Sequence, residues 1–93
     1  MKQTQIDVTD VRFTAAQEQE TETGLLGYVS CVVNRAVRLD GLTLRRTREG
    51  RLTISYPARA SDSGRRRFLI RPVDDASRRE LERQVIAAIG ADG

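Results

Sequence analysis

Apolar and polar residues alternate along most of this chain, and that period of two limits what it can fold into. A strand turns successive side chains to opposite faces, so alternation predicts half-buried strands. We expect strands within 6–14, 25–47, 51–57 and 67–71, and a helix over 75–90. Because 93 residues make one domain, the pattern predicts a single α+β domain. Its antiparallel sheet has four to five strands, with one C-terminal helix packed on it.

Two of the expected strands contain irregularities. The first changes face near Thr9-Asp10. Within 25–47, the part from Leu25 to Val33 is apolar on both faces, which suits a central strand and makes Cys31 an inert buried thiol. Farther along, the apolar residues change parity across Asp40-Gly41. That change indicates either a β-bulge in one long strand or a hairpin with a type I′ turn.

Three stretches interrupt the alternation. Residues 15–23 (AAQEQETET) predict a solvated acidic loop, 45–50 (RRTREG) a basic turn, and 58–66 (ARASDSGRR) a turn-rich loop. The strands that flank 58–66 should form a hairpin with arginines at its tip. Tyr56 and Phe68 share the apolar parity of those strands, so we expect both in the core. Stacking on unpaired bases is the alternative for them and for Tyr28.

The C-terminal segment shows helical spacing instead. Asp75, or Ser77 with Glu80 three residues later, can cap the N-terminus, and Gly90 is a natural end. An apolar stripe on one face predicts packing against the sheet, and it consists of Leu81, Val85, Ala88 and Ile89.

The ionisable residues exclude most catalytic and metal sites. The chain has no histidine, a single cysteine (Cys31) and a single lysine (Lys2). A zinc site within one chain, an intrachain disulfide and a near-neutral acid–base group are therefore excluded. We expect a protein that is not an enzyme and has no cofactor and no metal. No apolar run approaches the roughly 20 residues that span a bilayer, and we expect a cytoplasmic protein.

Basic charge is concentrated in the second half of the sequence. Residues 45–93 carry twelve arginines and seven acidic residues, whereas residues 1–44 carry four basic and six acidic ones. Concentrated basic charge is what phosphate recognition requires. The alternative is that a coding bias towards arginine produced charges that are simply solvated.

Five short motifs follow one another between residues 6 and 90. They are Val8-Thr9-Asp10-Val11-Arg12, Tyr28-Val29-Ser30, Gly50 to Ile54 with Tyr56-Pro57-Ala58-Arg59, Gly64-Arg65 with Arg67 and Pro72, and the segment from Asp75 to Val85. In this order they resemble the I-T-D-V-R, Y-A-S, G-L-hydrophobic to M-P-S-R, and D-G-K-F-R-D-I-A-H-P segments, and the closing helix, of one bacterial family. It is the septation protein, or stage V sporulation protein G (SpoVG), family.

The resemblance implies a homodimer that binds DNA, and RNA in some members, and regulates cell division, sporulation or gene expression. By this resemblance, Arg59 occupies the arginine position of the family's S-R-basic segment, which is tied to DNA binding. Arg65 occupies a basic position of the loop, and Arg67 matches the arginine of the strand that returns from the loop. The predicted nucleic-acid-binding residues are Arg59, Arg65, Arg66, Arg67 and Arg71. A secondary basic patch, for which plain solvation is an equal alternative, consists of Arg45, Arg46, Arg48 and Arg51.

This chain also departs from the family pattern. Ala58 and Ala60 replace a serine and a basic residue, while Arg66 and Arg71 replace an aromatic residue and a histidine. These changes remove one hydroxyl donor and one charge and add two charges elsewhere. The alternative function is a protein-interaction module of cell division or envelope regulation that binds no nucleic acid.

Overall fold

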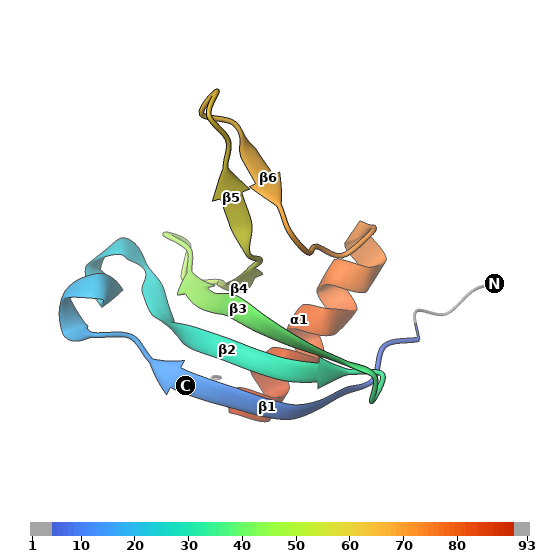
Figure 1. The fold of residues 1–93 in the computed structure, drawn as a ribbon. Coiled ribbons are helices and arrows are strands. Elements are labelled where there is room, and N and C mark those ends of the chain that lie inside the picture. Colours follow the sequence, from blue (N-terminus) through green and yellow to red (C-terminus); the bar gives the residue numbers. More distant parts are fainter. Residues whose placement is uncertain (1–4, 91–93) are drawn as a thin grey trace.

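The computed structural model describes residues 5–90, which form a four-stranded antiparallel sheet, a separate small hairpin and a C-terminal helix (Figure 1). The sheet has the order β1-β2-β3-β4. Its strands are β1 (Val8–Ala15), β2 (Leu25–Val33), β3 (Val37–Arg46) and β4 (Leu52–Ser55). The hairpin consists of β5 (Ala58–Ala60) and β6 (Arg66–Phe68), and helix α1 spans Asp75–Ile89. The predicted α+β class is confirmed.

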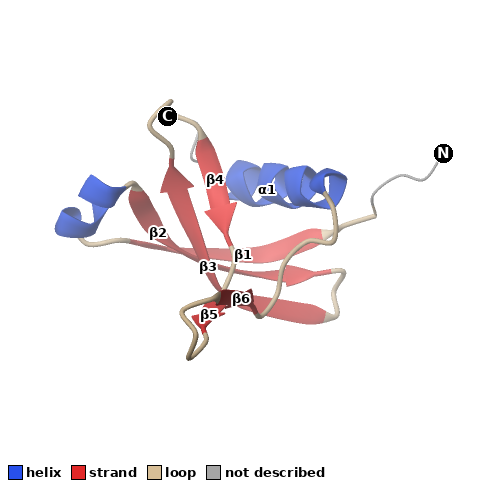
Figure 2. Ribbon diagram, turned by 90° about the horizontal axis from the view of Figure 1, so that it is seen from above, coloured by secondary structure: helices blue, strands red, loops and turns tan. Residues whose placement is uncertain are grey.

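The core lies between one face of the sheet and α1, which runs along one side of the sheet in Figure 2. In β2 every second residue is buried from Leu25 to Cys31, as expected for a strand with one face in the core. Cys31 is fully buried, and burial raises the pKa of its thiol. Among residues 5–90, the buried hydrophobic residues are Leu25, Val29, Cys31, Leu39, Leu42, Leu44, Ile54, Tyr56, Leu81 and Val85.

Both predicted irregularities are β-bulges. The register of β1 with β2 shifts between Thr9 and Arg12, where Asp10 has a φ of 48°. Asp10 accepts hydrogen bonds from the guanidinium groups of Arg12 and Arg38, and these bonds lower the pKa of its carboxyl. Of the two alternatives at Asp40-Gly41, the bulge is confirmed, because β3 runs unbroken through it and Gly41 has a φ of 80°.

The turn between β2 and β3 is at Asn34-Arg35, where the sequence pattern had given no signal. Both residues have positive φ, at 53° and 55°, and Ala36 N donates to Val33 O at 3.0 Å. Asparagine tolerates this left-handed region better than most residues, and two consecutive positive φ angles match the twist of the flanking strands.

Two of the predicted loops contain regular structure. The acidic stretch forms a short 3-10 helix, η1 (Glu18–Thr23), in which Glu20 accepts from Gln17 N at 3.0 Å, and all but one of its six residues are exposed. The prediction of a plain loop there is wrong, although its exposure is as expected. The predicted loop at 58–66 contains β5, and the strand predicted over 67–71 is only the short β6. Strand β4 therefore does not pair with β6, and the basic hairpin is separate from the sheet.

Helix α1 begins at Asp75, as the predicted range did, but its N-cap lies one residue before the first predicted cap, Asp75, and three before the second, Ser77. The Asp74 carboxylate accepts from Ser77 N at 2.8 Å, so Asp74 is the N-cap and both predicted caps are wrong. The predicted stripe is right for Leu81 and Val85, which are buried, but Ala88 is exposed. Gly90 ends the helix with a φ of 73°, as predicted.

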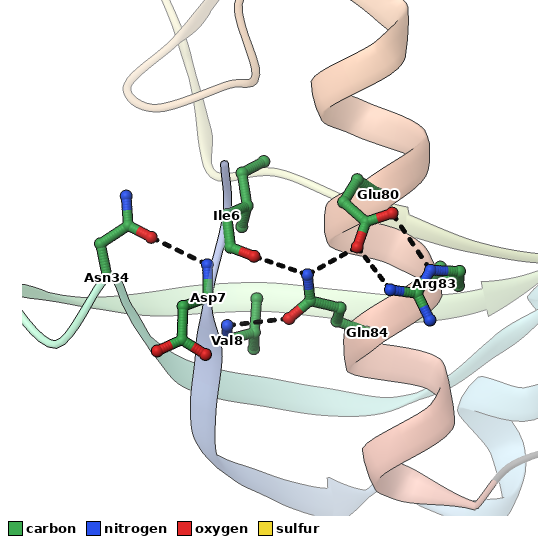
Figure 3. A network of polar contacts seen from close by, with 7 residues as sticks. All are labelled: Ile6, Asp7, Val8, Asn34, Glu80, Arg83 and Gln84. Carbon is green, nitrogen blue, oxygen red and sulfur yellow. Dashed lines mark hydrogen bonds and ion pairs between the residues drawn. The ribbon is translucent and has the colours of Figure 1, made fainter. Parts of the chain in front are cut away.

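Polar side chains also attach α1 to the sheet. Gln84 Oε1 accepts from Val8 N at 2.9 Å, and Gln84 Nε2 donates to Ile6 O at 2.7 Å and to the Glu80 carboxylate (Figure 3). On the other edge, Glu82 accepts from Ile54 N at 3.2 Å. These bonds satisfy backbone groups at both outer strands of the sheet.

Candidate nucleic-acid interface

The hairpin that carries the predicted arginines projects away from the sheet (Figure 1). Pro57 separates β4 from β5, and Pro57 O accepts from Leu69 N at 2.9 Å. At the tip, Ser61 N donates to Arg65 O at 2.7 Å, and Gly64 takes a φ of 82° that an L-residue rarely adopts. The chain therefore reverses tightly, and all residues of 58–68 except Ala58 and Ser61 are exposed to solvent.

Two arginines of the hairpin lie directly opposite each other. Arg59 in β5 is the Cα partner of Arg67 in β6, and both are exposed. Arg66 pairs with Ala60 and points to the other face, because side chains alternate along a strand. Like charges that face each other across two strands destabilise the pairing. An anion bound between the two guanidinium groups would offset that repulsion.

Ion pairing divides the arginines of the protein into two groups. In the N-terminal half, Arg12, Arg35 and Arg38 each pair with an aspartate. In α1, Arg78 and Arg83 pair with acidic residues of the same helix. Within residues 5–90, no ion pair and no guanidinium hydrogen bond forms at Arg45, Arg46, Arg48, Arg51, Arg59, Arg65, Arg66, Arg67, Arg71 or Arg79. All five predicted binding residues thus keep their guanidinium donors free.

Arg71 lies outside the hairpin strands, in the segment that leads to α1. Its guanidinium carbon is 5.6 Å from the centre of the Phe68 ring, a cation–π arrangement. Arg59 and Arg67 thus form one cross-strand pair, whereas Arg71 belongs to a second group with Phe68. The predicted site is therefore one basic stretch of sequence with two separate groups, the Arg59–Arg67 pair and the Arg71–Phe68 pair.

The secondary basic patch is separate from the hairpin. Arg45 and Arg46 belong to β3, while Arg48 and Arg51 are in the turn before β4, so β4 lies between this patch and the hairpin. Arg46 and Arg48 line a depression of about 420 Å³ together with Glu22 of the acidic η1. A nearby carboxylate weakens the local positive potential. The two predicted patches therefore do not merge into one site.

The three aromatic candidates differ in their surroundings. Tyr56 is in the core as predicted, and burial raises the pKa of its hydroxyl, which has no hydrogen-bond partner among the described residues. Tyr28 is exposed and donates to Glu20 at 2.8 Å. The prediction that Phe68 lies in the core is wrong: 48 % of it is exposed, because β6 leaves the sheet.

The sequence pattern missed an exposed apolar stretch beside the arginines. Leu69 is 62 % exposed and Val73 is 89 % exposed, and Ile70 is exposed as well. Their alternation resembled that of a sheet strand. The high density of charge argues against a strand of the central sheet there, since four arginines flank three apolar residues over 65–71.

Neither the family models nor the curated proteins that were compared with this sequence include a match to it. Within residues 5–90, no helix is long and apolar enough to cross a membrane. The same residues contain no group of three or more cysteine, aspartate or glutamate side chains placed to hold a metal ion.

Proposed function

We propose that this protein is a cytoplasmic, homodimeric nucleic-acid-binding regulator of the SpoVG type, without catalytic activity and without a cofactor. It binds the phosphate backbone of DNA, and of RNA, through Arg59, Arg65, Arg66, Arg67 and Arg71. The regulated processes that the sequence resemblance suggests are septation in cell division, sporulation and gene expression in bacteria.

The observation that carries this proposal is the set of unpaired arginines on a projecting hairpin. A guanidinium group presents paired donors that match phosphate oxygens, and it remains charged at every physiological pH. Elsewhere within residues 5–90, carboxylates pair with five arginines, which are Arg12, Arg35, Arg38, Arg78 and Arg83. On the hairpin, Arg59 and Arg67 are directly opposite, and neither has such a partner among the described residues. This arrangement favours an anionic ligand with repeated charges.

Fluorescence anisotropy with labelled duplex DNA and single-stranded RNA at two salt concentrations tests the proposal. The logarithm of the affinity should fall with the logarithm of the salt concentration, with a slope of about −0.9 per phosphate contacted on duplex DNA. The triple change of Arg65, Arg66 and Arg67 to alanine should weaken binding and make that slope shallower. Absence of binding at low salt by folded protein would refute the proposal.

A matched control is the triple change of Arg46, Arg48 and Arg51 to alanine. It removes the same charge from exposed or turn positions of the secondary patch. If the hairpin is the site, this control retains most of the affinity and the full salt slope. Equal losses in the two triple variants would mean that only net charge attracts the nucleic acid.

The alternative is a protein-interaction module of cell division or envelope regulation that binds no nucleic acid. It is favoured by one observation, the exposed apolar residues Leu69, Ile70 and Val73. Affinity capture that recovers one stoichiometric protein partner, with and without nuclease treatment, would support this module. Loss of the captured material after nuclease treatment would support nucleic-acid binding instead.

A further inference from the structure

A cavity of about 660 Å³ lies where the segment after the hairpin meets the beginning of α1. Its size is within the range of about 300–1,000 Å³ that is common for small-ligand sites. Tyr56 is the one buried residue of its lining. The cavity is also lined by Phe68, Arg71, Pro72, Val73 and Arg78. In Figure 1 the same segment connects the projecting hairpin to the upper end of α1. Of the proposed phosphate-binding arginines, Arg71 lines the cavity.

The lining combines an exposed aromatic ring with a free cation. Phe68 is 48 % exposed, and the Arg71 guanidinium is 5.6 Å from its ring centre. Single-stranded nucleic acids are bound by this combination, in which bases stack on aromatic rings or guanidinium planes while cations follow the backbone. A base that stacks against Phe68 would cover apolar surface that is otherwise exposed to water.

The charged groups around the cavity are not equivalent. Arg78 is held by Asp75 and Glu82, and the Asp74 carboxylate caps the helix. Arg71 has no ion pair within the part of the chain that the structure describes. One guanidinium is therefore available for a phosphate that adjoins the cavity, while the hairpin arginines can hold the following phosphates.

A second copy of the chain fits this cavity less well. The centres of protein–protein interfaces are depleted of charged residues, whereas Arg71, Asp74, Asp75 and Arg78 all line the cavity. The exposed side chains of Leu69 and Ile70 do not belong to its lining. The cavity and the remaining apolar surface can therefore be tested separately.

We propose that the cavity accepts an unpaired base of a single-stranded nucleic acid, which stacks on Phe68 while Arg71 binds its phosphate. This inference rests on the proposed function and deepens it, because it names single-stranded or locally unpaired nucleic acid as the preferred ligand. The hairpin arginines then provide affinity for any phosphate backbone, and the cavity provides the preference for unpaired bases.

The test compares two single-stranded oligonucleotides of equal length, one with normal bases and one with abasic sites in its central positions. Both carry the same phosphate charge, so any difference in affinity measured by anisotropy comes from the bases. The abasic strand should bind about 5- to 150-fold more weakly, the loss that removal of base–aromatic stacking typically causes. Phe68→Ala should reduce the affinity for the normal strand by a similar factor and should leave the abasic strand unaffected.

Leu69→Ala is the matched control, since it removes an exposed apolar side chain from the same stretch without changing the lining of the cavity. It should retain the difference between the two strands. Equal binding of the normal and abasic strands by the unmodified protein overturns the base-binding inference and leaves the phosphate proposal intact. Failure of both strands and of duplex DNA to bind overturns both proposals.

A second copy as the occupant gives a different result. In that case Phe68→Ala lowers the mass measured by sedimentation and does not change the ratio of the two affinities, which overturns the inference. A changed ratio at unchanged mass supports it.

Discussion

At the scale of single residues, the side chain of Gln84 bonds to the first residue of β1 and to the segment just before it, as a neighbouring strand would. It accepts from Val8 N and donates to Ile6 O, at 2.9 and 2.7 Å (Figure 3). Gln84→Ala leaves both part-buried backbone groups without these partners. We expect the free energy of unfolding to fall by about 1–3 kcal/mol, the usual cost of such groups, in urea denaturation followed by circular dichroism.

Gln84→Glu keeps one of the two bonds of that side chain and removes the other. A carboxylate can still accept from Val8 N but cannot donate to Ile6 O, and it faces the carboxylate of Glu80. This variant should therefore also lose stability near neutral pH. Exposed Arg79, changed to alanine, is the reference for a helix substitution without such contacts. If Gln84→Ala were no more destabilising than Arg79→Ala, the two bonds would contribute nothing.

Glu80 makes the stability of the fold depend on pH in the acidic range. Hydrogen bonds from Arg83 and Gln84 lower the pKa of its carboxyl from the ordinary 4.5 to about 2. The folded state therefore binds this proton more weakly than the unfolded state. Its stabilisation is complete above about pH 4.5 and is lost as the pH falls towards 2.

Glu80→Gln removes this titration and tests its contribution. The stability of the unmodified protein should fall more steeply than that of the variant as the pH decreases from about 4.5 to about 2. Acid unfolding of the two proteins, followed by circular dichroism, measures the difference. Parallel curves over that range would show that the Glu80 contacts do not persist in solution.

At the scale of elements, the pairing of β1 with β2 requires a glycine at position 27. A Cβ there would lie 2.5 Å from the ring of Phe13 and 2.5 Å from Thr14 O. The Phe13 ring therefore covers the glycine, and the backbone oxygen limits the space independently of that ring. Gly27→Ala should destabilise the protein by about 1–3 kcal/mol, the typical cost of overpacking, as measured by thermal or urea unfolding.

The double variant Phe13→Ala, Gly27→Ala identifies which contact matters. Because the backbone of Thr14 stays in place, removal of the ring should not restore the stability lost in Gly27→Ala. Full restoration would mean that the ring was the only obstacle and that β1 can shift away from β2.

The hairpin differs from the sheet in the way it is supported. Its two strands have three residues each and pair only with each other, and an isolated two-stranded hairpin is marginally stable in water. The facing pair Arg59 and Arg67 weakens it further. A bound phosphate backbone, which neutralises both guanidinium groups, would therefore both occupy and stabilise this element.

At the scale of the whole molecule, the core is small for a protein that must stay folded alone. Among the residues that the structure describes, ten apolar ones are buried, while Val37, Leu69 and Ile70 remain exposed. Small domains often gain stability from association. We expect sedimentation equilibrium to give twice the chain mass of 10.4 kDa and the melting temperature to rise with protein concentration. A species of 10.4 kDa with a constant melting temperature would argue against the proposed homodimer.

The sequence by itself determined the class of the fold and most of its elements. Alternation and helical spacing follow from backbone geometry over a few residues, so the strands of the sheet, the helix and the bulge near Thr9-Asp10 were predictable. The concentration of arginine in residues 45–71 was equally visible, because charge is a property of composition.

Only the tertiary structure decided which of these signals belong to the core and which to a surface. Phe68 alternates like a core residue, yet it is exposed because β6 pairs with β5 and leaves the sheet. Likewise, Arg38 and Arg59 are the same residue type, but Arg38 is paired with Asp10, whereas Arg59 has no ion pair within residues 5–90. Strand partners and ion pairs depend on distances between residues far apart in the chain, and a local pattern contains no information on those distances.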